Sequence, residues 1–180
     1  MKGIVFTEFL ELVETKFGLE MVDRIIEESD LKSNGIYTAV GTYEFSEMLQ
    51  LLTRLSEHTE IDPDDLLLVY GEHFFNVLVT NYSFLLDIYN TPIDLLSSIE
   101  NHIHVEVRKI YPDAELPTFK VLDKTPKSLI MVYSSSRALY NFGLGLMNKT
   151  FEHFNASATI LLEKIRPDGT EVKFSITQNE

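Results

Sequence analysis

The chain has 180 residues, of which 44% are hydrophobic, and this suffices for one domain with a substantial core. Its 15 Lys and Arg against 28 Asp and Glu give a formal net charge of −13, which argues against nucleic-acid binding and against an anionic membrane surface. Cysteine is absent, so disulfides, thiolate metal sites and thiol catalysis are excluded. We expect a cytoplasmic protein, because no signal peptide or membrane-length apolar run occurs.

The first part of the chain carries helical patterns of apolar residues. The spacing predicts helices at about 2–17, 19–29, 43–58 and 63–79, a loop over 31–42 and a short helix at about 82–89. Gly18 suits the end of the first helix, and the run from Asp62 to Asp65, with Pro63 inside it, suits the start of the fourth. We therefore expect residues 1–60 to form a helical N-terminal subdomain.

The stretch from Thr91 to Tyr111 reads as one further helix. Thr91 is a good N-cap, Pro92 suits the first helical position and Pro112 ends the pattern. One face is apolar through Leu96, Ile99, Ile103, Val107 and Ile110. His104 lies beside this stripe and is a candidate metal ligand. His102 points about 200° away on a helix, so the two histidines cannot chelate one ion.

The remainder of the chain has a β-rich texture around one helix. Strands are predicted at about 118–123, 128–134, 158–165 and 171–176, with a helix at 136–153 and a hairpin turn at Pro167, Asp168 and Gly169. This ββαββ order indicates a four-stranded antiparallel sheet with a helix on one face. With the preceding helices, the fold class is α+β, and residues 61–180 form its second part.

Tyr133, Ser135 and Arg137 alternate, so on an extended strand they point the same way and offer donors suited to carboxylates. Each residue also has a plainer interpretation: a lone histidine usually lies at the surface or in a hydrogen bond, and a lone arginine is usually exposed. No HExxH, P-loop, GxSxG or GxGxxG motif occurs. Because no acid and base or nucleophile and base are paired in the sequence, we do not expect an enzyme.

Taken together, these motifs resemble one family over essentially the whole chain. They are the start Met1-Lys2-Gly3, the segment IHVEVRKIYPDAELP that holds His104, the Tyr133-x-Ser135-x-Arg137 triplet, and the helix at 139–147 with its GLGL. The chain resembles the haem nitric oxide/oxygen binding (H-NOX) domain, which is related to the haem domain of soluble guanylate cyclase. The resemblance implies the H-NOX fold over residues 1–180 as a single domain.

The resemblance also implies roles for individual residues. His104 matches the proximal ligand of the iron of haem b. Tyr133, Ser135 and Arg137 match the clamp on the haem propionates, which agrees with the need of buried carboxylates for charge-assisted hydrogen bonds. Pro117 matches a family proline that presses on the porphyrin.

The distal side is expected to decide which gas binds. Oxygen-binding members have a tyrosine donor on the distal helix, and alignment through Arg137 and the GLGL segment puts Phe142 at that position. Around it, the resemblance places apolar residues that cannot donate: Val5, Phe9, Phe74, Leu78 and Leu146. This predicts a pocket that binds nitric oxide and CO and discriminates against oxygen.

The expected output is release of His104 when nitric oxide binds. Because the sequence ends soon after the last strand, the signal is expected to act in trans on a histidine kinase or a cyclic-di-GMP synthase or phosphodiesterase, as the family implies. Two alternatives remain open. Tyr140 in the pocket would favour an oxygen or redox haem sensor, and a haem-free chain would be a module for an apolar ligand.

Overall fold

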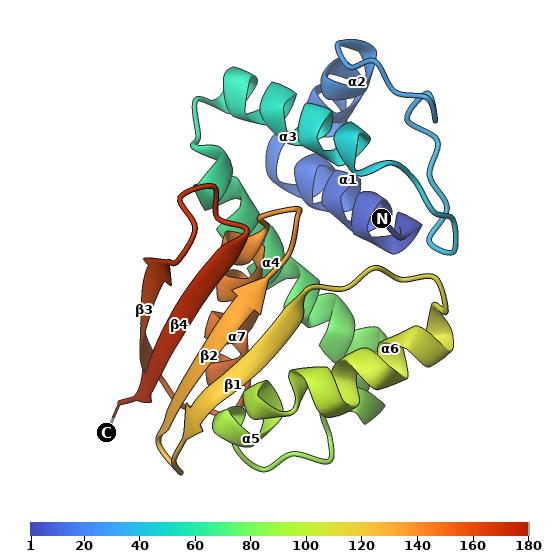
Figure 1. Ribbon diagram of the computed structural model, residues 1–180. Coiled ribbons are helices and arrows are strands. Elements are labelled where there is room, and N and C mark those ends of the chain that lie inside the picture. Colours follow the sequence, from blue (N-terminus) through green and yellow to red (C-terminus); the bar gives the residue numbers. More distant parts are fainter. Residues whose placement is uncertain (180) are drawn as a thin grey trace. The chain divides into compact units, whose positions relative to one another are not determined.

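The computed structural model describes residues 1–179, which form seven α-helices and one four-stranded antiparallel sheet (Figure 1). The chain divides into two compact units, Met1–Tyr70 and the residues from Gly71 onward. The division falls inside helix α4, which therefore contributes to both units. The predicted α+β class is confirmed.

The first unit is helical. It contains α1 (Gly3–Phe17), α2 (Leu19–Glu27), α3 (Phe45–Thr59) and the first turns of α4 (Pro63–Asn81). The loop before α3 is held by the buried carboxylate of Glu47, which accepts hydrogen bonds from Ser33 at 2.5 Å and Tyr37 at 2.8 Å. Gly18 has φ +86° between α1 and α2, a conformation that glycine adopts without strain.

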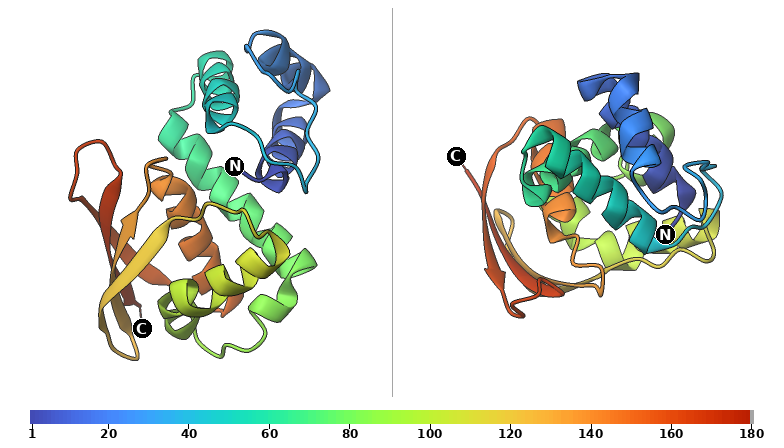
Figure 2. Two further views of the ribbon diagram at one scale, coloured as in Figure 1. Left: turned by 45° about the vertical axis from the view of Figure 1, so that its right-hand side comes forward. Right: turned by 90° about the horizontal axis from the view of Figure 1, so that it is seen from above.

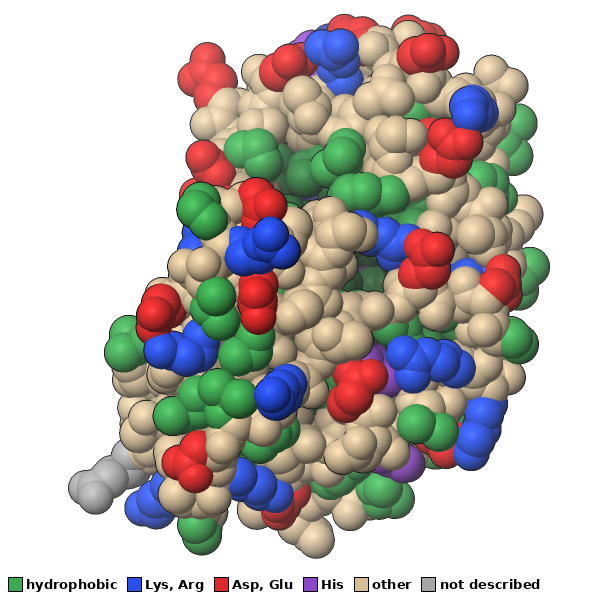
Figure 3. Space-filling model, in the orientation of Figure 1, with side chains coloured by type: hydrophobic (Ala, Val, Ile, Leu, Met, Phe, Trp, Pro, Cys, Tyr) green, Lys and Arg blue, Asp and Glu red, His purple; other side chains and the backbone are tan. Residues whose placement is uncertain are grey.

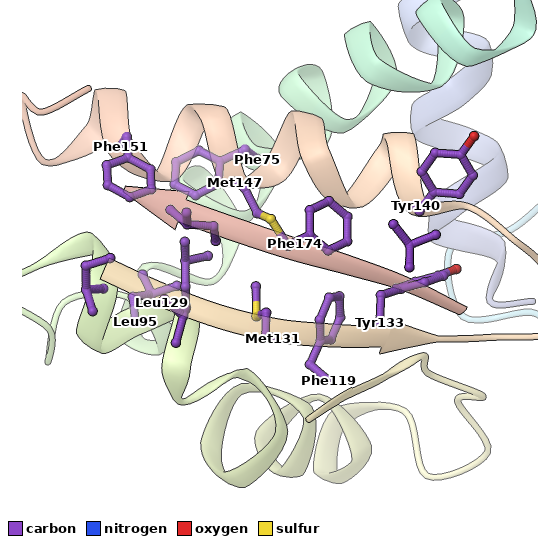
Figure 4. Close-up of a cluster of buried hydrophobic side chains, with 14 of the residues drawn as sticks. Phe75, Leu95, Phe119, Leu129, Met131, Tyr133, Tyr140, Met147, Phe151 and Phe174 are labelled. Atoms are coloured by element: carbon purple, nitrogen blue, oxygen red, sulfur yellow. The ribbon is translucent and has the colours of Figure 1, made fainter. Parts of the chain in front are cut away.

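The second unit is built around the sheet. Its strands are β1 (Thr118–Lys124), β2 (Ser128–Ser134), β3 (Ala158–Lys164) and β4 (Glu171–Gln178), in the order β1-β2-β4-β3. Helix α7 (Tyr140–His153) covers one face (Figure 2). Inward residues of both layers form a shared core, which includes Leu129, Met131, Met147, Phe151 and Phe174 (Figure 4). The predicted ββαββ arrangement is confirmed.

The prediction of one regular helix over Thr91–Tyr111 is wrong. The structure has α5 (Pro92–Ser97), a π-helix (Ile99–Ile103) and α6 (His104–Ile110). The side chains of Ser97 and Ser98 donate to the carbonyl of Asp94 at 3.0 and 2.8 Å, and such local bonds compete with helical ones. In the π-helix that follows, backbone hydrogen bonds join residues five apart. This change displaces Ile110 from the predicted apolar stripe, and the side chain of Ile110 is exposed.

Two other predicted helices are shorter than expected. The segment predicted as a helix at 82–89 forms only a 3-10 turn, Ser83–Leu85, whose backbone bonds join residues three apart. Helix α7 begins at Tyr140 rather than at residue 136. Ala138 has φ +52°, and the N–H of Leu139 bonds to the hydroxyl of Tyr133, so the helical pattern cannot extend back through these residues.

The charged side chains on the surface are mixed in sign. On the face drawn in Figure 3, acidic and basic side chains are interspersed over the described residues, and the basic ones do not gather into a patch. Within residues 1–179, every helix is too short or too polar to cross a lipid bilayer.

Candidate haem-binding site

His104 is the first residue of α6 and one of the few buried polar residues of the chain. Burial lowers the pKa of its imidazole, an effect that the nearby Glu100 opposes and Arg108 reinforces. A histidine held neutral is the form that binds a metal, because a ring nitrogen keeps its lone pair. His102 instead lies beside Tyr89, with 2.8 Å between its Nδ1 and the tyrosine oxygen.

The side of His104 that carries Nδ1 faces Glu100. Oε2 of Glu100 lies 3.4 Å from Nδ1, but the arrangement lacks hydrogen-bond geometry, and Nδ1 is buried with no hydrogen-bond partner among the described residues. Because Nδ1 is on the Glu100 side, Nε2 is the nitrogen available to a metal.

Phe119 on β1 connects His104 to the sheet. Its ring centroid is 6.0 Å from that of His104 and 5.5 Å from that of Tyr133. Phe119 and Tyr133 are direct partners in the β1–β2 register, and their side chains lie next to each other in the core (Figure 4). The histidine and the tyrosine of the predicted clamp thus flank one phenylalanine.

Tyr133, Ser135 and Arg137 were predicted to point the same way because they alternate on one strand. This reason is wrong, because the three residues do not lie on one strand. Strand β2 ends at Ser134, and the following residues form a turn in which the N–H of Arg137 donates to Oγ of Ser135 at 3.2 Å. Tyr133 Oη accepts from the N–H of Leu139 at 2.9 Å. Burial raises the pKa of Tyr133, while Ser135, Leu139 and Arg137 each lower it, so the three predicted residues do act on one another.

Arg137 already binds a carboxylate. Its side chain is 16% exposed, Nη1 donates to the carbonyl of Glu115 at 3.0 Å, and Nη2 contacts the carboxylate of the same residue. The Glu115 side chain is 81% exposed. The contact shows that the guanidinium can hold a carboxylate on a flexible stem. Pro117 is half-buried two residues further along the same loop.

Four of the predicted distal residues belong to the second unit. Phe74 and Leu78 lie on α4, and Phe142 and Leu146 lie on α7; all four are half-buried. The two helices approach closely: a Cβ on Gly71 would come within 2.1 Å of the Phe142 carbonyl oxygen. A Cβ on Gly143 would meet nothing within 4 Å, among the described residues outside its own helical turn, although this glycine is buried. There is room beside α7 at this point.

The other two predicted distal residues belong to the first unit. Phe9 is 1% exposed and packs against the ring of Tyr70, with 5.3 Å between centroids. Val5 is half-buried, and its carbonyl accepts a 2.5 Å hydrogen bond from the hydroxyl of Tyr70. Within their own unit, both residues are therefore organised by Tyr70.

Tyr140, the alternative distal donor, points into the core of the second unit. It is 7% exposed, and its ring packs against Gly169 in the β3–β4 turn, with the ammonium of Lys164 5.0 Å from the ring centroid. Figure 4 shows Tyr140 at the start of α7. This direction leaves Phe142 as the aromatic residue of α7 beside Phe74.

The residues of the second unit fit a haem. They supply a buried neutral imidazole, a guanidinium that holds a carboxylate, half-buried apolar side chains and space beside Gly143. Within residues 1–179, no three His, Asp or Glu side chains gather as a metal cluster.

Comparison with known proteins gives the family. The model of the haem-NO-binding family matches residues 2–162. The structure of the unliganded Fe(II) H-NOX protein from K. algicida has 69% sequence identity and a TM-score of 0.98, over 100% of this chain and 97% of that one. The Fe(II)CO H-NOX from Shewanella woodyi, bound to IWP-051, has 37% identity and a TM-score of 0.84, over 99% of this chain and 95% of that one.

A third structure, the Fe(II)NO H-NOX protein from S. oneidensis, shares the fold at 23% identity, with a TM-score of 0.92 over 100% of both chains. No curated protein matches the sequence. The chain belongs to the H-NOX family, whose members bind haem and serve as gas-sensing modules. The predicted family and fold are confirmed.

Three residues that the sequence did not single out take part in this arrangement: Glu100, Glu115 and Phe119. Glu100 precedes His104 by four residues, a spacing that brings two side chains together on a helix and could have suggested the contact. No comparable signal existed for Phe119 or Glu115, because their positions depend on the β1–β2 register and on the loop after α6.

Proposed function

We propose that this domain binds haem b through His104 and senses nitric oxide, with discrimination against oxygen. The observation that carries the proposal is the buried imidazole of His104, joined through Phe119 to the Tyr133–Arg137 turn within one unit. Residues 1–180 act as a single sensor domain. When bound, haem supplies a ferrous iron that takes diatomic ligands.

The chain's own residues have distinct roles in this proposal. Nε2 of His104 would bind the iron, Arg137 would hold the propionates with Tyr133 and Ser135, and Pro117 would press on the macrocycle. The H-NOX protein of S. oneidensis has been seen in an Fe(II)NO state and that of S. woodyi in an Fe(II)CO state, which supports nitric oxide and CO as ligands.

The apolar side chains of α4 and α7 support discrimination against oxygen. Bound oxygen is polar and is stabilised by a hydrogen-bond donor, whereas Phe74, Leu78, Phe142 and Leu146 offer none. The direction of Tyr140 into the core argues against an oxygen sensor that depends on this hydroxyl.

Signalling is proposed to follow from release of His104 on nitric oxide binding. Release of His104 would free α6 from its tether to the iron, and the contact of His104 with Phe119 on β1 would be free to change. We infer a non-enzymatic cytoplasmic sensor that acts in trans on a histidine kinase or on a cyclic-di-GMP synthase or phosphodiesterase.

His104→Gly tests the ligation. The variant should lose the ferrous spectrum of the wild type, and added imidazole should restore it, because free imidazole can occupy the space of the missing side chain. The matched control is His58→Gly, which removes a histidine paired with Glu28 in the first unit and should leave the spectrum unchanged. An unchanged His104→Gly spectrum would remove His104 from this role.

A further inference from the structure

Glu100 occupies an unusual place in the chain. It lies in the π-helix Ile99–Ile103, which ends directly before His104. The Ser98 carbonyl accepts from the N–H groups of both His102 and Ile103, at 2.9 and 3.4 Å, so the turn is widened here. Single π turns inside helices occur frequently at functional sites.

The Glu100 carboxylate touches three groups. Oε2 accepts from the backbone N–H of Phe119 at 3.0 Å and lies 3.4 Å from Nδ1 of His104. Oε1 lies 3.9 Å from Nη2 of Arg108, whose side chain is 44% exposed. Glu100 is itself 32% exposed, so its negative charge is only partly screened by water.

The hydrogen bond to Phe119 fixes the carboxylate to the end of the sheet, next to the histidine. A ring nitrogen that faces a carboxylate carries the proton and donates it, which leaves the opposite nitrogen as the metal ligand and makes it more basic. The two atoms are 3.4 Å apart but poorly aligned for a hydrogen bond, and a rotation of the imidazole would align them. Such contacts are often long before a ligand is bound and tighten in the complex.

We propose that Glu100 is a positioning residue for His104: its carboxylate orients the imidazole, strengthens the bond of Nε2 to the iron and links this ligand to β1 through the N–H of Phe119. The proposal rests on the proposed function, since it requires His104 to be the proximal ligand. It makes Glu100 a determinant of how readily His104 is released.

Glu100→Gln separates the charge from the shape. The amide oxygen can still accept from Phe119, while the negative charge that faces Nδ1 is lost. The iron–histidine stretching frequency of the ferrous holoprotein, measured by resonance Raman, should fall. Because loss of such a partner typically weakens metal binding by about 10–100-fold, free imidazole should also displace His104 at correspondingly lower concentrations.

The control is Glu106→Gln, on α6 with His104, where the carboxylate pairs with Lys109 at 2.6 Å. It should leave the frequency unchanged. An unchanged frequency in Glu100→Gln, or an equal fall in both variants, overturns the proposal. If the wild-type protein shows no iron–histidine band, the proposed function fails instead, so the two failures are distinguishable.

Arg108→Ala provides an independent arm that does not depend on the stability of Glu100→Gln. Its exposed side chain can be removed with little effect on folding, and its positive charge near Oε1 partly offsets the carboxylate. Its loss should raise the iron–histidine frequency. A frequency that falls or stays unchanged in Arg108→Ala contradicts the role assigned to the Glu100 charge.

Discussion

The rings of Phe74 on α4 and Phe142 on α7 lie 5.5 Å apart and are tilted by 58°. Neither side chain can donate a hydrogen bond, and the nearest tyrosine along α7, Tyr140, is buried against Gly169 in the β3–β4 turn. If haem binds beside these rings, a ligand on the iron meets only apolar groups there. This relationship is the structural basis for the proposed choice of gas.

Phe142→Tyr should convert the domain toward oxygen binding. The added hydroxyl supplies a donor, and a net hydrogen bond of about 0.5–1.5 kcal/mol predicts roughly a 2–10-fold gain in oxygen affinity. Absorption titration of the ferrous protein with oxygen measures it. Phe154→Tyr, at the far end of α7, is the control and should have no effect. Equal oxygen affinities in the wild type and Phe142→Tyr would show that residue 142 does not face the gas.

Arg137→Ala should weaken haem binding. A hydrogen bond to a charged group is worth about 1.5–3 kcal/mol, which corresponds to a loss of roughly 10–150-fold in haem affinity for each bond removed. The rate of haem transfer to an apoglobin acceptor gives the comparison. Arg166→Ala removes an exposed arginine from the β3–β4 turn and should not change the transfer. Faster transfer confined to Arg137→Ala is the expected result; equal rates would exclude a propionate clamp at Arg137.

Thr91 stabilises the start of α5. Its Oγ1 accepts from the N–H of Asp94 at 3.1 Å and donates to the Asp94 carboxylate at 2.8 Å. Thr91→Ala should lower the free energy of unfolding by about 0.5–2 kcal/mol, the usual cost of losing a cap. Denaturant unfolding measures this loss. Thr53→Ala, at an exposed position inside α3, should be close to neutral, and an equal loss there would argue against a capping effect.

The pH dependence of stability at the start of α5 follows from the carboxyl group of Asp94. Hydrogen bonds from Lys124 and Thr91 lower the pKa of its carboxyl below the ordinary 3.8. The stabilisation is therefore present above pH 3.8 and is lost as the pH falls through the lowered value in the folded protein. Asp94→Asn should remove this part of the acid dependence, although the effect is small because the group is exposed.

Much of the fold was predictable because local chemistry and tertiary packing agree. Strand β4 alternates between buried and less buried residues along most of its length, and Gly169, with φ +75°, occupies the predicted turn. The break in the predicted helix over residues 91–111 was not predictable from periodicity. It depends on which carbonyl the side chains of Ser97 and Ser98 select, and the apolar pattern continues through it.

For the site, the residue types were predictable and their geometry was not. The sequence singles out His104 as a metal ligand and Arg137 as a guanidinium that binds carboxylates. It did not predict that Ser135 and Arg137 lie in a turn after β2 and not on the strand. That turn exists because Tyr133 accepts the N–H of Leu139 and delays the start of α7. Phe119 lies between His104 and Tyr133 because the β1–β2 register pairs Phe119 with Tyr133. This register could not be predicted from the individual residues.

The absorption spectrum of the purified, reduced protein tests the central claim most directly. The Soret band should shift on addition of nitric oxide, and exposure to air should not produce a stable oxy spectrum. A stable oxy complex, or a band that nitric oxide leaves unchanged, would contradict the account of a haem-based nitric oxide sensor that discriminates against oxygen.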